Sequence, residues 1–128
     1  MATLKFDPDA SVIITEAKIW GRLVTTSRMV FDTGASLVMI PLKLASALGL
    51  DINPERTITT TTASAIESAP VVTIPKMSVL GLQVKNVEAI VKDLPGDSGV
   101  DGLLGLSFIK HFKVEIDFKL GKLTLKEI

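Results

Sequence analysis

The sequence predicts a mainly β protein that forms a single domain over residues 1–128 and contains two short helices. Two observations lead to this fold class. Apolar and polar residues alternate clearly near the C-terminus, and turn-forming residues separate several short apolar segments. The aromatic residues are few, with five Phe, one Trp and no Tyr, which indicates an aliphatic core. A chain of this length can bury roughly two thirds of its unfolded surface, so we expect a core of Val, Ile and Leu.

The clearest alternation predicts a C-terminal hairpin with one buried and one solvated face. Gly121 is expected in the turn between its strands, and polar or charged residues lie between the apolar ones. The residues expected on the buried face are Val114, Ile116, Phe118, Leu123 and Leu125.

Two further pairs of strands are expected earlier in the chain. The first pair covers residues 11–20 and 22–31, with a glycine between the strands. The second pair covers residues 69–80 and 83–92, with a Gly-Leu pair between them. Pro75 lies inside one of these strands, and because proline cannot donate a ladder hydrogen bond it predicts an edge position or a bulge.

The two helices are predicted from their boundary residues. Segment 41–50 begins with Pro41, which is tolerated in a first helical turn, and reaches Gly49, a typical C-terminal stop. Segment 106–112 follows another glycine and is long enough for one or two turns. The segment richest in turn residues is 93–102, and the chain shows no internal repeat or linker.

Composition excludes several classes of function. Fourteen basic residues balance fourteen acidic ones, so no long-range attraction to nucleic acid or to an anionic membrane surface is expected. The absence of cysteine excludes a disulfide framework, a thiolate nucleophile and Cys-ligated zinc. No apolar run approaches the roughly 20 residues of a membrane-spanning helix, and the first ten residues lack the features of a secretory signal. We therefore expect a soluble cytoplasmic protein.

One ionisable residue, Asp32, interrupts the apolar segment MVFDTGASLVMIP at 29–41. A buried charge is costly unless it is paired or hydrogen-bonded, so this carboxylate is either solvated in a turn or retained for chemistry. Gly34 allows a backbone N–H to approach the carboxylate, Thr33 supplies a hydroxyl, and Ala35 adds no bulk. By itself, the Asp-Thr-Gly triplet predicts only a turn.

Together with VDGLLG at 100–105, this motif resembles the retropepsin-like aspartic proteases, in particular their single-domain prokaryotic members. The similarity covers most of the chain. The helix IPLKLASALGL follows the motif, the Thr-rich TITTTTASA falls where the family has its flap, GLQVKNVEAIV precedes the loop, and DGLLGLSFIKHF leads into the terminal hairpin. The resemblance implies a retropepsin-like acid protease barrel that acts as a symmetric homodimer and needs no cofactor or metal ion.

The resemblance also implies roles for individual residues. Asp32 is then the catalytic carboxylate that activates a water molecule, and Thr33 and Gly34 orient it. The structural brace beneath the aspartate turn is Leu103, Leu104 and Gly105. The flap and walls that bind an extended peptide or protein substrate are Ala35, Thr62, Ala63, Ser64, Ala65 and Ile66.

This chemistry needs two carboxylates, because one must accept a proton while the other donates one. Two such groups about 3 Å apart share a single proton. The chain has one Asp-Thr-Gly motif, so the second Asp32 is expected from another copy across a two-fold axis. Asp101 is the rival within the chain, but it lacks the Thr-Gly support, and we expect it to have a turn or capping role.

Other readings of the sequence stay open or fail. Asp97 and Asp101 suggest a calcium loop only faintly, because Phe108 stands where the bidentate Glu should be. His111 is expected to be a partly exposed helix residue rather than a base. Residues 51–80 contain no glycine, which brings easy opening of a flap into question. The alternative function is a catalytically inactive retropepsin-fold module for peptide binding or assembly.

Overall fold

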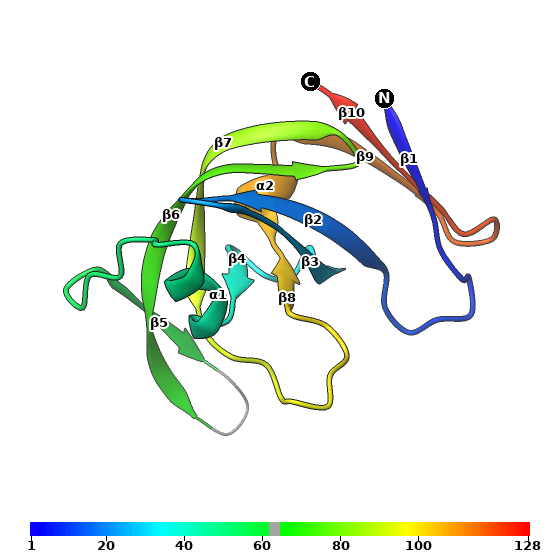
Figure 1. Cartoon of the computed structure of the whole chain (residues 1–128). Helices are drawn as coiled ribbons and strands as arrows, with labels where there is room; N and C mark the ends of the chain where they lie inside the picture. The colour runs from blue at the N-terminus through cyan, green and yellow to red at the C-terminus, as the bar shows by residue number, and fades with distance from the viewer. Residues whose placement is uncertain (62–64) are drawn as a thin grey trace.

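The computed structural model describes residues 1–61 and 65–128, and it confirms a mainly β fold with two short helices (Figure 1). The elements are β1 (Ala2–Lys5), β2 (Ile14–Trp20), β3 (Val24–Phe31), β4 (Val38–Ile40), α1 (Leu42–Ala47), β5 (Thr57–Thr61), β6 (Ile66–Val79), β7 (Leu82–Val91), β8 (Gly102–Leu104), α2 (Leu106–Ile109), β9 (Phe112–Asp117) and β10 (Lys122–Glu127).

The larger sheet closes into a barrel. Its strands follow the order β2-β3-β8-β4-β7-β6-β5, and β6 also pairs with β2. Most neighbours are antiparallel, but β8 runs parallel to β3 and β4 runs parallel to β7. The first residues of the long β6 pair with β5, so that these two strands form a hairpin that extends beyond the barrel (Figure 1).

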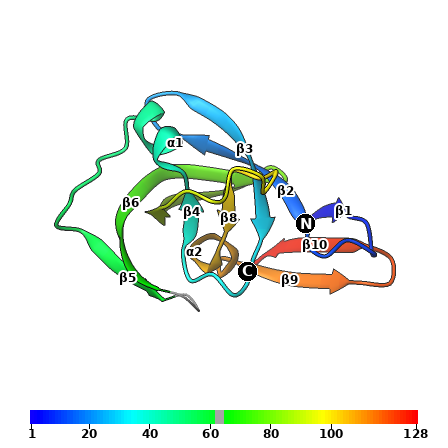
Figure 2. The same ribbon diagram turned by 90° about the horizontal axis from the view of Figure 1, so that it is seen from below.

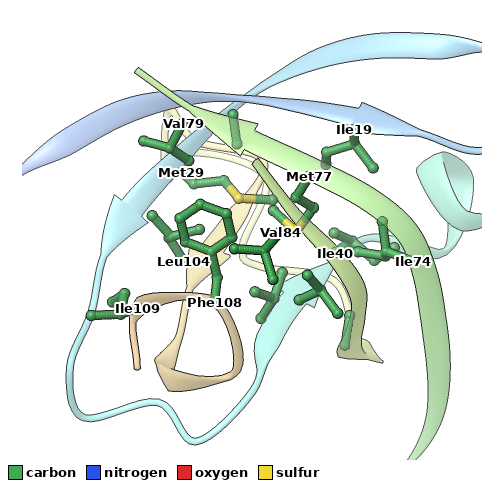
Figure 3. Packing of buried hydrophobic residues seen from close by; sticks show 14 of the residues in the cluster. Ile19, Met29, Ile40, Ile74, Met77, Val79, Val84, Leu104, Phe108 and Ile109 are labelled. Carbon is green, nitrogen blue, oxygen red and sulfur yellow. The ribbon is translucent and has the colours of Figure 1, made fainter. Parts of the chain in front are cut away.

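The core fills the inside of this barrel. Along β2 the side chains of Ala17 and Ile19 are buried while Lys18 between them is exposed, which is the period of two expected for a strand with one inward face. Figure 3 shows the ring of Phe108 pointing from α2 into this cluster, where Leu104 also packs. The core is mainly aliphatic, as composition predicted.

The terminal strands form a separate sheet in the order β1-β10-β9. Leu123 lies opposite Leu4 of β1 and Ile116 of β9, so the three strands share one apolar face. Figure 2 shows this sheet beside the barrel with both chain ends at it. The predicted hairpin is therefore present, and β1 completes it with residues that have no strong strand signal.

Phe118 is a correction to the predicted hairpin. β9 ends at Asp117, whose Oδ1 accepts hydrogen bonds from the N–H groups of Lys119 and Leu120, so the chain turns before Phe118 can continue the strand. The Phe118 side chain is 65% exposed and lies edge-on to Phe6, with 6.2 Å between ring centroids.

The predicted first helix is confirmed at both of its ends. Leu42 follows Pro41 and its N–H donates to Asp93 Oδ1 at 3.0 Å, a cap supplied by a distant segment. Gly49 has φ +66°, a conformation that favours glycine just after a helix, and the N–H of Leu50 returns to the carbonyl of Ala45.

Pro75 lies where β6 has a partner strand on one side only, so the predicted edge position is confirmed locally and no bulge forms. The pairs on either side of it, Ile74 with Val87 and Lys76 with Lys85, keep the same register, so no residue is inserted. The ladder skips Pro75, which faces Asn86 with φ +55°. Pairing with β2 begins only at the next residue of β6, so proline stands where a ladder donor is not used.

No helix in the described part of the chain is long and apolar enough to cross a membrane.

Candidate active site

Asp32 follows β3 directly, and its turn is fixed by backbone hydrogen bonds. Its N–H donates to the carbonyl of Leu104 at 3.0 Å, which ties the turn to β8. The N–H of Gly34 donates to Asp32 Oδ1 at 2.9 Å, and the N–H of Ala35 donates to the Asp32 carbonyl at 3.3 Å. The partly buried carboxylate therefore has a set orientation on a rigid support.

β8 and the residue after it lie against this turn. Leu103 and Leu104 pair in parallel with the last two residues of β3, and Leu104 is fully buried. A Cβ placed on Gly105 would come within 2.3 Å of the Leu37 carbonyl oxygen and 2.8 Å of that of Ala35, so only glycine fits there. The structure thus places the three predicted brace residues in contact with the aspartate turn or its strand.

A hollow of about 410 Å³ opens on Asp32 between its turn and β5. The other described residues that line it are Gly34, Ala35, Ser36, Leu37, Met39, Ile58, Thr59, Thr61, Ile90, Lys92 and Leu103. They come from the aspartate loop, β4, β5, β7 and β8 and from the residue that follows β7. Most of these side chains are apolar, so the hollow suits an apolar side chain beside a reacting bond.

A second hollow, of about 370 Å³, is also lined by Asp32, together with Thr33. Its walls come from the segment between β1 and β2, the end of β3 and the β9 turn. The described residues that complete it are Phe6, Pro8, Ala10, Ser11, Val12, Ile13, Val30, Phe31, Ile116 and Phe118. Asp32 therefore contributes to two largely apolar hollows.

Two other charged groups have structural partners. Lys92 at the rim of the first hollow forms an ion pair with Glu67 of β6, with 3.0 Å between Nζ and Oε2. Asp101 accepts a hydrogen bond from the backbone N–H of Arg28 at 2.9 Å through Oδ2, and its own N–H donates to the Arg28 carbonyl. The carboxylate of Asp101 thus holds the 93–102 loop to β3, as its expected turn role requires.

The predicted flap residues are only partly described. Thr62, Ala63 and Ser64 lie outside the described residues. Ala65 and Ile66 are exposed, and the described lining of the hollow at Asp32 does not include them. His111 is exposed just after α2, and Phe108, at the position of the missing calcium ligand, is buried in the core.

Sequence reasoning missed much of the cleft wall. Ile58, Ile90 and Met39 line it, yet each lies in an apolar or β-branched run that predicts only a strand. The Thr-rich run at 57–62 was the single local pattern that pointed to part of this wall, because it predicted one arm of a flap. Which strands meet at Asp32 depends on pairings that no short pattern encodes.

Comparison with known proteins gives three findings. A family model described as aspartyl protease matches residues 15–108. The fold is similar to the crystal structure of a retropepsin-like aspartic protease from Rickettsia conorii, with 27% sequence identity, a TM-score of 0.72, and coverage of 96% of this chain and 87% of that one. It is also similar to the retroviral protease-like domain of Ddi1 from Leishmania major, with 18% identity, a TM-score of 0.57, and coverage of 94% and 92%.

A comparison with curated proteins finds no match. The likeness to the Leishmania domain concerns the fold alone, whereas the family match runs from β2 into α2 and so includes the Asp32 turn, its brace and the β5–β6 hairpin. The resemblance indicated by the sequence motifs is therefore confirmed, and the chain belongs to the aspartyl protease family, with a retropepsin-like fold.

Proposed function

We propose that this protein is an aspartic endopeptidase whose active site uses two Asp32 carboxylates, one from each subunit of a homodimer. One observation carries the proposal: among the described residues that line the two hollows, Asp32 is the only carboxylate. Asp101 is engaged at β3 and lines a different depression, together with residues of α1. The second acid must therefore come from another chain.

The mechanism follows from one proton shared by two close carboxylates. The ionised Asp32 takes a proton from a water molecule, and the water oxygen attacks the peptide carbonyl carbon. The protonated Asp32 donates its proton to the carbonyl oxygen, which gives a neutral tetrahedral intermediate. The C–N bond then breaks as the Asp32 that took the water proton gives it to the leaving nitrogen, while the other Asp32 takes back one hydroxyl proton from the intermediate. The products are a carboxylic acid and an amine, and the pair again holds one proton.

The two hollows support an extended peptide as substrate. An extended chain presents alternate side chains to separate pockets, and Asp32 lines two hollows that could receive them. Because both are lined mainly by apolar groups, apolar residues around the cleaved bond are favoured. Ala35 lies at the first hollow, and Ala65, Ile66 and residues 62–64 are proposed to cover the peptide as the flap.

The proposed dimer brings two aspartate turns together across a two-fold axis. Thr33 is exposed beside Asp32 and is proposed to face its counterpart there. β10 already lies between β1 and β9, so the outer edges of the terminal sheet belong to β1 and β9. A second protomer that uses this sheet must contact those edges or the polar outer face, rather than insert a strand next to β10.

The decisive experiment is peptide cleavage by the wild-type protein, Asp32→Asn and Asp101→Asn. Asp32→Asn keeps the shape of the side chain but cannot be the ionised partner, so kcat/KM should fall by about three orders of magnitude or more. Asp101→Asn retains an oxygen that can accept from the Arg28 N–H, so its activity should stay near that of the wild type.

Activity lost in Asp101→Asn and kept in Asp32→Asn would reverse this assignment. A wild-type protein that binds peptides in the cleft without cleaving them, under conditions in which it is dimeric, would favour the inactive binding module instead.

A further inference from the structure

The hydroxyl of Ser107 joins two strands that meet at the active site. Ser107 lies in α2 and is 7% exposed. Its Oγ accepts a hydrogen bond from the backbone N–H of Val38 at 2.9 Å and donates to the carbonyl of Glu88 at 2.7 Å. Val38 begins β4, directly after the aspartate loop, and Glu88 belongs to β7.

These two backbone groups mark the beginning of the β4–β7 ladder. The strands are parallel, with Val38 opposite Ala89, and in this pattern the Val38 N–H is directed toward the carbonyl that precedes Ala89, which is that of Glu88. The serine hydroxyl connects the same donor to the same acceptor. It therefore secures the ladder at the point where the aspartate loop becomes a strand.

The backbone of α2 holds the loop just before this point. The N–H of Leu106 donates to the carbonyl of Ala35 at 2.8 Å, and the N–H of Ser107 donates to that of Ser36 at 3.0 Å. Ala35, Ser36 and Leu37 all line the hollow at Asp32. Two backbone contacts thus run from α2 to the loop, and the Ser107 hydroxyl adds a contact to Val38 and extends the set to β7, which carries Ile90 of the same hollow.

We infer that Ser107 is a positioning residue for the proposed peptidase reaction: its hydroxyl fixes the cleft segment 35–38 relative to β7. The inference rests on the proposed function for its effect on catalysis, but not for its effect on the loop. Because a buried N–H or carbonyl is rarely left without a partner, removing the hydroxyl loosens the β4–β7 ladder at its first pair, Val38 and Ala89, and shifts the segment that presents Asp32 to substrate.

The test compares full-length Ser107→Ala and Ser107→Thr with Ser78→Ala. Like Ser107, Ser78 is a buried serine, but it lies in β6 and lines a depression that does not include Asp32. Its alanine variant therefore controls for a general loss of stability. For each protein kcat and KM on one peptide, the unfolding midpoint in urea, and hydrogen exchange of the Val38 amide are measured.

We expect Ser107→Ala to lower kcat by about tenfold to a hundredfold with little change in KM, because a small displacement of reacting groups has effects of this size. Exchange of the Val38 amide should accelerate by about tenfold or more while the barrel stays folded. Ser107→Thr keeps the hydroxyl and should restore both values. Ser78→Ala should keep the wild-type kcat at a similar unfolding midpoint.

Three results would overturn the inference: unchanged exchange at Val38 in Ser107→Ala, equal losses in the alanine and threonine variants, or an equal loss of kcat in Ser78→Ala. If the wild-type protein cleaves no peptide, the proposed function fails, and Val38 exchange alone then decides whether Ser107 positions the loop. If Ser107→Ala does not fold, Ser107→Cys keeps a weak donor and acceptor at the same place and gives the same readouts with a smaller expected change.

Discussion

Asp101 and Asp32 carry the same side chain but make different kinds of contact in the fold. Asp101 accepts a hydrogen bond from the backbone N–H of Arg28 in β3, so its carboxylate joins a loop to the barrel. Asp32 accepts from Gly34, two residues further along its own turn, and opens on two hollows. The contact made by Asp101 connects distant parts of the fold, whereas that made by Asp32 orients the carboxylate within its own turn. This difference is the reason for placing the chemistry at Asp32.

Ala35 is expected to set the pH range of activity. In pepsin-like enzymes a hydroxyl residue at this position can donate to the carboxylate and favour its ionised form, and Ala35 cannot. The wild-type profile of kcat/KM should be a bell with its optimum at mildly acidic pH, because the carboxylate pair works with one proton. Ala35→Ser should move the optimum toward acid, whereas Ala47→Ser, in α1, should not move it.

An unchanged profile in Ala35→Ser would show that position 35 does not affect the pair. A profile that stays flat from acid to alkaline pH would argue against a shared proton.

Gly105 should be intolerant of even one added carbon. Alanine there would place its Cβ 2.3 Å from the carbonyl oxygen of Leu37, which is backbone and cannot rotate away. Gly105→Ala should therefore lower the free energy of unfolding by about 1–3 kcal/mol and reduce activity, because the displaced oxygen belongs to the aspartate loop. Gly96→Ala is the control, since no atom lies within 4 Å of its added carbon. Equal urea midpoints for the two variants would contradict the close approach.

Among the secondary-structure elements, the length of each strand largely determined whether it could be predicted. β2, β3, β6 and β7 are seven residues or longer, and alternation or a long apolar run marks each of them. β4 and β8 have three residues each, which is too short to establish an alternation of apolar and polar residues, and all three side chains of β4 are buried. β1 is equally weak alone. These short strands are defined by their pairing with other strands, so they cannot be recognised from the sequence pattern alone.

In the β9–β10 hairpin, the carboxyl group of Glu115 has a lowered pKa. Lys126 donates a hydrogen bond to Glu115 Oε1 at 2.9 Å, and this contact lowers the pKa of Glu115 below its usual value. A lowered pKa in the folded state stabilises the protein above the ordinary glutamate range and loses that effect as the pH falls through the lowered value.

Glu115→Gln should therefore be slightly less stable than the wild type at neutral pH, and the difference in urea midpoint should shrink below about pH 4. The effect is small because Glu115 is fully exposed. Glu127→Gln on the same hairpin is the control. A difference that grows toward acid would mean that the contact with Lys126 does not stabilise the folded chain.

For the whole molecule, the sequence predicted the family, the aspartate turn and its brace, but not the cleft. Asp32 lies in one compact motif, and Leu104 and Gly105 lie in another, so a short pattern marks each of them although their contact is long-range. The cleft instead combines Ile58, Ile90 and residues of the aspartate loop, which come together only when the barrel closes through β6 and β2. Ser107 was missed for the same reason, since its two partners belong to strands far from it in sequence.

The proposed dimer makes a quantitative prediction for mixed subunits. If each active site needs two Asp32 residues, then after subunit exchange an equal mixture of wild type and Asp32→Asn should keep about a quarter of the wild-type activity, because only homodimers of wild type have both acids. Activity should also fall on dilution, in step with the dimer measured by sedimentation. About half the activity in the mixture, or full activity in a monomer, would show that each chain acts alone.

The order of strands in the terminal sheet also constrains when the fold can be completed. In the described ladders β1 pairs only with β10. Ala2 can therefore pair only after Leu125 has been synthesised, and Leu4 only after Leu123. During synthesis the barrel strands can therefore find one another while the first residues of the chain remain without their partner. Contacts that join such distant parts of a chain form slowly, and an unpaired apolar strand is prone to wrong association in the meantime. β1 is thus secured only after β10 has been made.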